Sequence, residues 1–161
     1  MKTSKRIVVV LAVLLLMVVG LFCIKMLMIE KGVTAVEDGR YEEAVKYIEP
    51  LSKLGDSNAQ YLFGLLHVNG WGVEKDRDEA IRWFRMAAMW HDGDYDEAAP
   101  AAYYLGREQF EEYDEQYWQS EINKQELTEA VFWIEWSADH GYPHAAEMVA
   151  YLKNKGIIEN K

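Results

Sequence analysis

Acidic and aromatic residues crowd the stretch from Glu108 to Glu121, where paired carboxylates could supply a general acid and a general base. Hydrolysis of this kind needs one carboxyl group with a raised pKa in a dry pocket, and a charged loop offers the reverse. The sequence has no nucleophile elbow, and its one cysteine, Cys23, lies in an apolar segment. We therefore predict no enzymatic activity, no catalytic residue and no cofactor.

Two histidines and a glycine-rich turn are the other candidates for a ligand site. His140 and His144 are four residues apart, but a glycine and a proline lie between them, so the imidazoles do not share a helical face as two zinc ligands would. Gly70-Trp71-Gly72 joins two expected helices and lacks the preceding strand of a phosphate loop. The sequence thus predicts a turn at these glycines and no metal site.

The elements that position any binding surface are helices, because three segments repeat one helical pattern. Each begins with Glu-Ala, has large residues three and four positions after the alanine, and has a small residue eight positions after it. This spacing places the side chains on one face, with small residues where another helix approaches. We call these the B helices. Their alanines are Ala44, Ala80 and Ala130, and we expect Trp83 and Trp133 to be equivalent core residues.

Partner helices, which we call A helices, share a second pattern that begins with alanine. The three copies are Ala59–Gly64, Ala101–Gly106 and Ala145–Ala150, and no B helix follows the third. Ala44 and Ala80 are 36 residues apart, near the period of a helix-turn-helix repeat, whereas Ala80 and Ala130 are 50 residues apart. The second repeat therefore carries insertions around residues 91–99 and after residue 110.

Capping residues agree with this division into helices. Asp76 and Glu79 form an Asp-x-x-Glu cap at the start of one B helix. Gly55 and Gly141 lie just beyond two other B helices, where a left-handed residue lets the chain leave the helix.

The three prolines are less uniform. Pro100 and Pro143 suit the first turns of A helices, where the N–H that proline lacks would be unpaired. Pro50 lies inside a helix predicted over residues 41–54 and should kink that helix or end it early.

The stretch from Asn58 to Ala88 combines these features in their clearest form. Its A helix contains an alanine and a glycine, and its turn reads Gly-Trp-Gly-Val. An aspartate precedes its B helix, which contains Ala, Trp-Phe and Ala-Ala. This pattern resembles the Sel-like repeat (SLR) family, which is related to the tetratricopeptide repeats. The resemblance implies an all-α protein whose helix-turn-helix repeats form an α/α-solenoid with the A helices on its concave face. Proteins of this family act as adaptors and scaffolds.

Upstream of the repeats, residues 7–24 form an uncharged apolar run, and Met26–Ile29 extend it past Lys25. At about 1.5 Å per residue this run spans about 27 Å, nearly the hydrocarbon core of a membrane. Basic residues precede it, at Lys2, Lys5 and Arg6. The positive-inside rule then predicts a single-pass inner-membrane protein with a cytoplasmic N-terminus and a periplasmic, extracytoplasmic C-terminal domain.

Two alternatives to an uncleaved anchor stay open. One is a cleaved signal peptide, although no small-x-small pair closes the apolar run. The other is a lipoprotein modified at Cys23, although bulky residues precede this cysteine.

The resulting division has a membrane anchor, repeats and a final helix. We expect a cytoplasmic basic N-terminus (1–6), a transmembrane signal-anchor helix (7–29), a partial first repeat (30–57), an SLR repeat (58–91), a divergent SLR repeat with insertions (92–141) and a C-terminal capping helix (142–161).

The domain after the anchor is strongly acidic. It holds all 27 acidic residues but only 13 of the 17 basic ones, for a net charge of about −14 with neutral histidines. Phosphate backbones and anionic lipid both repel such a domain, so we expect no nucleic acid partner. A basic protein partner would be steered towards it, while acidity of this kind also simply favours solubility.

The predicted partner surface combines variable positions of the A helices with the long insertion of the second repeat. Aromatic residues beside acids are typical of recognition surfaces, although the same aromatics could instead fold back onto their own repeat. The predicted partner-binding residues are Leu62, Leu65, Trp71, Tyr104, Arg107, Glu108, Glu111, Tyr113, Tyr117 and Trp118.

We expect a membrane-anchored SLR protein whose extracytoplasmic solenoid binds another protein, as an adaptor, scaffold or regulator in the cell envelope. The alternative is an immunity protein that neutralises a toxin delivered to the envelope, since the small size, acidity, anchor and aromatic insertion all fit. Hydrolysis of β-lactams, associated with some cysteine-rich family members, is the least favoured, because the domain after the anchor has no cysteine.

Overall fold

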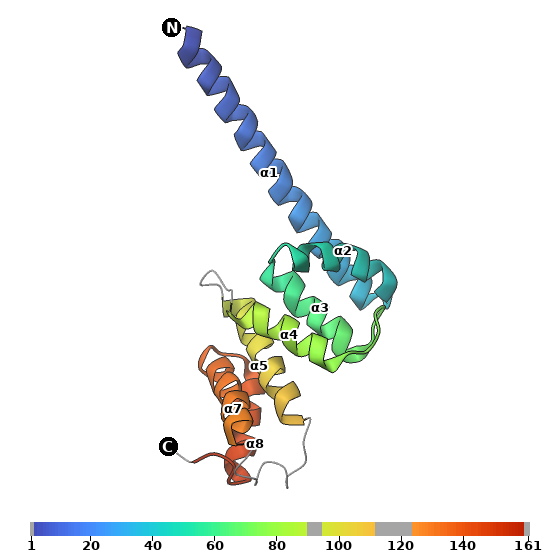
Figure 1. Cartoon of the computed structure of the whole chain (residues 1–161), viewed down its shortest axis with the longest axis vertical. Coiled ribbons are helices and arrows are strands. Elements are labelled where there is room, and N and C mark those ends of the chain that lie inside the picture. The colour runs from blue at the N-terminus through green and yellow to red at the C-terminus, as the bar shows by residue number, and fades with distance from the viewer. Residues whose placement is uncertain (1, 90–94, 112–123, 160–161) are drawn as a thin grey trace.

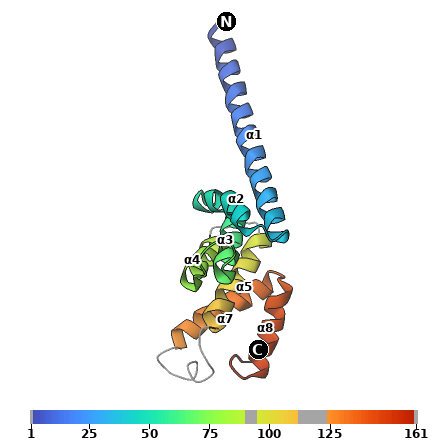
Figure 2. The same cartoon turned by 90° about the vertical axis from the view of Figure 1, so that its right-hand side faces the viewer.

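The computed structural model describes residues 2–89, 95–111 and 124–159, and all regular structure in these ranges is helical (Figure 1). A long N-terminal helix leads into a stack of shorter helices (Figures 1 and 2). This arrangement confirms the all-α class with one apolar N-terminal helix followed by packed, solenoid-like helices. The helices are α1 (Lys2–Glu37), α2 (Tyr41–Lys53), α3 (Ser57–Asn69), α4 (Arg77–Met89), α5 (Tyr95–Glu111), α7 (Lys124–Asp139) and α8 (Pro143–Asn154).

Each helix packs against the next one along the described chain, and α3 also contacts α5. The predicted repeats are therefore the pairs α3–α4 and α5–α7. The first B helix, α2, packs on the end of α1. An order of contacts that follows the sequence is expected of stacked repeats, since each unit touches only its neighbours.

One close contact recurs in all three helix pairs. A Cβ atom on Gly64 would lie 2.6 Å from a ring carbon of Phe84, and one on Gly106 would lie 2.8 Å from Cγ1 of Ile134. In the first pair, a Cβ atom on Gly32 would lie 2.8 Å from Cγ1 of Ile48. Only glycine lets the two helices approach so closely without a shift.

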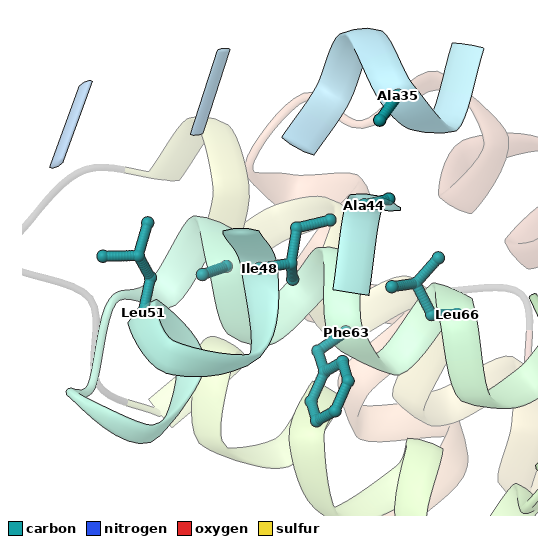
Figure 3. Close-up of a cluster of buried hydrophobic side chains, with 7 residues drawn as sticks. Ala35, Ala44, Ile48, Leu51, Phe63 and Leu66 are labelled. Atoms are coloured by element: carbon teal, nitrogen blue, oxygen red, sulfur yellow. The ribbon is translucent and has the colours of Figure 1, made fainter. Parts of the chain in front are cut away.

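The equivalence of Gly32 with the repeat glycines shows what the end of α1 is. Ile48 occupies the same position after its B-helix alanine as the large residues opposite the other two glycines. Gly32 and Ala35 are buried against this region, and Figure 3 shows Ala35 above Ala44 and Ile48. The C-terminal part of α1 is thus the A helix of the first repeat, which the sequence alignment did not identify.

The N-terminal helix continues without a break through the predicted boundary between anchor and repeat. It has 36 residues, and its side chains are exposed from Arg6 to Leu27. Burial begins only at Met28. By length and composition this helix fits a membrane anchor or a signal sequence.

The two tryptophans expected in the core are only partly buried. Their neighbours Phe84 and Ile134 are the fully buried residues of these B helices, at 0 % exposure. The reason is the close contact at the glycine. The side chain that faces the A helix belongs to the residue four positions after the B-helix alanine, not to the tryptophan three positions after it. Trp83 instead packs edge-on against Phe63, with ring centroids 5.2 Å apart.

The predicted helix caps are confirmed. The backbone N–H of Glu79 donates to the Asp76 carboxylate over 2.9 Å. Gly55 and Gly141 both have left-handed φ angles, 88° and 85°, just beyond α2 and α7. These residues set where the helices start and stop.

One proline prediction, and one of the two alternatives of another, need correction. Pro50 does not end its helix early, because α2 continues to Lys53 and the N–H of Leu54 still reaches the Pro50 carbonyl over 3.2 Å. A proline removes its own N–H and crowds the carbonyl four residues earlier, and α2 continues to Lys53 despite both effects. Pro100 lies inside α5, which begins at Tyr95, because the alanine-rich residues around it favour helix on both sides. Pro143 begins α8, as predicted.

Candidate protein-binding surface

The three predicted binding residues of the first repeat are integrated with its core. Leu62 and Trp71 pack against the cluster shown in Figure 3, and Leu65 packs against the cluster around Phe84. Trp71 also stacks on Tyr41 at a centroid distance of 4.9 Å and an interplanar angle of 6°. These side chains are partly buried, so only part of each is accessible to a partner.

The glycines of the turn explain why Trp71 sits there. Gly72 has a φ of 71°, and a Cβ atom on it would lie 2.6 Å from the backbone carbonyl of Tyr41. The turn therefore packs directly on the start of α2, and the stacking of Trp71 on Tyr41 joins the same two segments. The Gly-Trp-Gly sequence links two neighbouring repeats.

Glu108 on α5 does not have the exposure that a direct partner contact needs. It is 4 % exposed, with one carboxylate oxygen 2.6 Å from Arg107 Nη2 and the other 3.2 Å from Arg77 Nε. Arg77 also donates to the Glu108 backbone carbonyl over 2.6 Å. Two guanidinium groups thus compensate the charge of this buried carboxylate, and Arg77 ties α4 to α5.

Tyr104 and Arg107, also predicted, meet three tyrosines that the sequence analysis did not select. Ring centroids are 5.8 Å apart for Tyr61 and Tyr104, 5.4 Å for Tyr103 and Tyr104, and 5.3 Å for Tyr103 and Tyr142. The Arg107 guanidinium lies 4.6 Å from the centre of the Tyr104 ring. We call these five residues the tyrosine surface.

The tyrosine surface is built from successive A helices. Tyr61 is on α3, Tyr103 and Tyr104 are on α5, and Tyr142 precedes the first residue of α8. All four are partly buried, and the side chain of His144 beside Tyr142 is 64 % exposed. The surface therefore spans three repeat units where their A helices adjoin.

Burial raises the pKa of two of these phenols, Tyr61 and Tyr142. The pKa of Tyr142 is raised to about 12, chiefly by burial and also by the neighbouring phenols of Tyr104 and Tyr103. Burial also raises the pKa of Tyr61 well above its usual range, while Arg107 opposes the effect. At neutral pH the surface presents uncharged rings and hydroxyls beside one guanidinium that Glu108 already neutralises. Stacking and hydrogen bonding are the interactions it offers.

A signal for this surface was present in the sequence. The third position of the A-helix pattern is tyrosine in two repeats, at Tyr61 and Tyr103. Comparing those positions across repeats would have selected both tyrosines. Tyr142 lies between the end of α7 and the start of α8, so this comparison would not have selected it.

The other predicted residues are not placed. Tyr113, Tyr117 and Trp118 lie outside the described residues, and Glu111 is described only as the last residue of α5. No group of three or more His, Cys, Asp or Glu residues that could hold a metal ion occurs in the part of the chain that the structure describes.

Comparison with known protein families agrees with the repeat architecture. Residues 57–89, which are α3, the glycine turn and α4, match the family model of the Sel1 repeat. Searches of curated proteins and of solved structures found no match. The chain thus contains a Sel1 repeat, which confirms the resemblance to Sel-like repeat proteins. Sel1 repeats generally mediate protein–protein interactions.

Proposed function

We propose that this protein is a single-pass membrane protein whose solenoid binds another protein outside the inner membrane. Its exposed apolar side chains from Ile7 to Leu27 suit contact with lipid. Lys2, Lys5 and Arg6 favour a cytoplasmic N-terminus, which directs the repeats to the periplasm. In this role the protein is a non-catalytic adaptor, scaffold or regulator of the cell envelope.

The tyrosine surface is the observation that carries the proposal of binding. Tyrosine and arginine are enriched at interface hot spots, because they supply a large contact area at a low cost in side-chain entropy. Ring packing already orients Tyr103 and Tyr104 before a partner arrives. A partner that lies along the A helices would touch three repeat units at once.

The acidic charge of the domain supports a basic partner. The tyrosine surface itself is close to neutral, so its surroundings rather than its core would steer association. Binding of a basic partner should therefore be faster at low ionic strength.

A photo-crosslinking amino acid at Tyr103 tests the binding surface in the living cell. We expect a crosslinked product with one envelope protein, whose identity separates a scaffold from an immunity protein. The matched control has the same amino acid at Arg82, an exposed position on the B helix α4. Equal products at both positions, or none at Tyr103, would contradict the proposal.

Protease added to spheroplasts tests the topology. We expect the repeats to be degraded while the inner membrane is intact, because only the anchor and the residues before it are shielded. Protection of the repeats would overturn the orientation, and a mature N-terminus after residue 20 would show a cleaved signal peptide.

A further inference from the structure

An apolar groove lies between the N-terminal helix and the turn from α2 to α3. Leu21, Ile24 and Met28 of α1 form one side, and Leu51 and Leu54 form the other. Its volume is about 440 Å³. One wall of the groove thus belongs to the apolar run, and the other belongs to the repeats.

Leu54 is unusual for a residue of the solenoid. Its exposure of 82 % is the highest of any large hydrophobic residue in the described ranges, above even those of α1. It follows the last residue of α2 and precedes Gly55, whose left-handed φ of 88° starts the turn towards α3. Leu54 is thus a highly exposed leucine that lines the same groove as Leu21 and Ile24.

Two contacts fix the position of this turn along the axis of α1. Lys25 Nζ lies 2.6 Å from the carboxylate of Asp56, whose side chain is only 8 % exposed. Asp56 also caps α3 by accepting from the N–H of Ala59 over 2.8 Å. Further along α1, the close packing of Gly32 on Ile48 holds α2 in place. Because α1 is unbroken, the turn stays level with the end of the apolar run.

We infer that this groove is a lipid site, filled by acyl chains of the membrane leaflet on the same side as the repeats, with Leu54 inserted at the membrane interface. The inference rests on the proposed membrane anchor. We expect lipid as the occupant because Leu21 and Ile24 belong both to the anchor and to the lining of the groove. An anchor that places them in hydrocarbon therefore brings lipid to the groove. Insertion of an apolar side chain about 5–10 Å into this boundary is the usual depth of interfacial segments.

Charged residues around the turn suit the same location. Lys25 interrupts the apolar run near its end and pairs with Asp56, and Lys53, just before Leu54, pairs with Glu49 at 2.6 Å. Lysine stems can lie along apolar surface while their charged ends stay at the polar boundary of the membrane. Asp56 is neutralised by Lys25, so no unpaired carboxylate is brought to the membrane at this turn. The domain as a whole is acidic, so the anchor and this locally neutral turn, not the net charge, hold the repeats against the membrane surface.

Depth-dependent fluorescence quenching tests this inference. The full-length protein with Cys23→Ser carries Leu54→Cys labelled with the environment-sensitive dye NBD, in phosphatidylethanolamine–phosphatidylglycerol vesicles that contain lipids spin-labelled on the acyl chain. We expect blue-shifted emission, quenched more by a spin label near the headgroup than by one near the chain end. Leu54 has few protein contacts to lose, so the variant should fold as the parent does.

Two further positions calibrate the result. Leu27→Cys on α1 should be quenched, and Tyr151→Cys on α8, an exposed apolar position with 48 % exposure, should not be. If the Leu54 probe behaves as the Tyr151 probe while the protein resists extraction by alkaline carbonate, the lipid site is wrong and the anchor stands. If carbonate extracts the protein, the anchor and the lipid site both fail.

Discussion

The two full repeats, α3–α4 and α5–α7, share one packing contact but differ in how their helices are connected. In each, a glycine of the A helix lies against the B-helix residue four positions after the repeat alanine. A four-residue Gly-Trp-Gly-Val sequence begins the first connection, whereas the second occupies residues 112–123. The comparison shows that a repeat is defined by the contact between helix faces and tolerates a change in the connection.

The two repeats also differ in the contacts of the first turn and of the second B helix. The turn of the first repeat packs on the backbone of Tyr41 and so belongs to the interface with the preceding unit. In the second repeat, Ser137 takes the place of Ala87 and donates to the Ala99 carbonyl over 2.6 Å. Packing against an apolar neighbour is thus replaced by a buried hydrogen bond.

The largest expected effect concerns the residues opposite the glycines. Phe84→Ala should lower the free energy of unfolding by about 3–5 kcal/mol and Ile134→Ala by about 2–5 kcal/mol, because each leaves a cavity in a close helix contact. Trp83→Ala should cost less than Phe84→Ala, since the indole is only partly buried. Denaturant unfolding of the detergent-solubilised chain, followed by circular dichroism, measures these values. A greater loss from Trp83→Ala would reverse our assignment of the core.

The glycines themselves should separate the two repeats. A Cβ atom on Gly106 would lie 2.5 Å from the backbone oxygen of Ala130, whereas the nearest atoms at Gly64 belong to the Phe84 ring. A ring can rotate or shift more easily than a backbone, so Gly106→Ala should be the more destabilising change, by about 1–3 kcal/mol. The matched control is Gly20→Ala on α1, which has no atom within 4 Å. Equal melting temperatures for the Gly106 and Gly20 variants would refute the shared contact.

The buried hydrogen bond of the second repeat should have a smaller effect. Ser137→Ala should cost about 0.5–1.5 kcal/mol, the usual net value of one such bond. The reciprocal change, Ala87→Ser, should also destabilise, because it buries a hydroxyl group in an apolar cluster. Thermal unfolding of both variants measures this difference, and a stabilised Ala87→Ser protein would show that the two sites are interchangeable.

The smallest expected change in stability concerns the connection of the second repeat. The double variant Tyr113→Ala, Trp118→Ala should weaken partner capture from envelope extract while the melting midpoint stays nearly unchanged. Loss of stability together with binding would make these aromatics part of the repeat core. Loss of neither would leave the tyrosine surface as the remaining site of interaction.

Local patterns predicted most of the helices but not every boundary. Asp76, Gly55 and Gly141 act through their own backbone and nearest neighbours, so their roles follow from sequence. Pro100 was misjudged, and the early helix end considered for Pro50 did not occur, because helix packing outweighs the loss of a single hydrogen bond. The burial of Glu108 could not be read from the sequence, because Arg77, which pairs with it, is 31 residues away in the chain.

The sequence by itself determined the apolar N-terminal helix, the A and B patterns and the Sel-like repeat, because hydrophobic periodicity and capping depend on residues within one or two helical turns. Only the tertiary structure decided that the end of α1 is also the first A helix, since Gly32 is identified by what lies opposite it. It likewise brought Tyr61, Tyr104 and Tyr142 together and set Leu54 beside Leu21. These contacts depend on how helices rotate and stack, which no local spacing specifies.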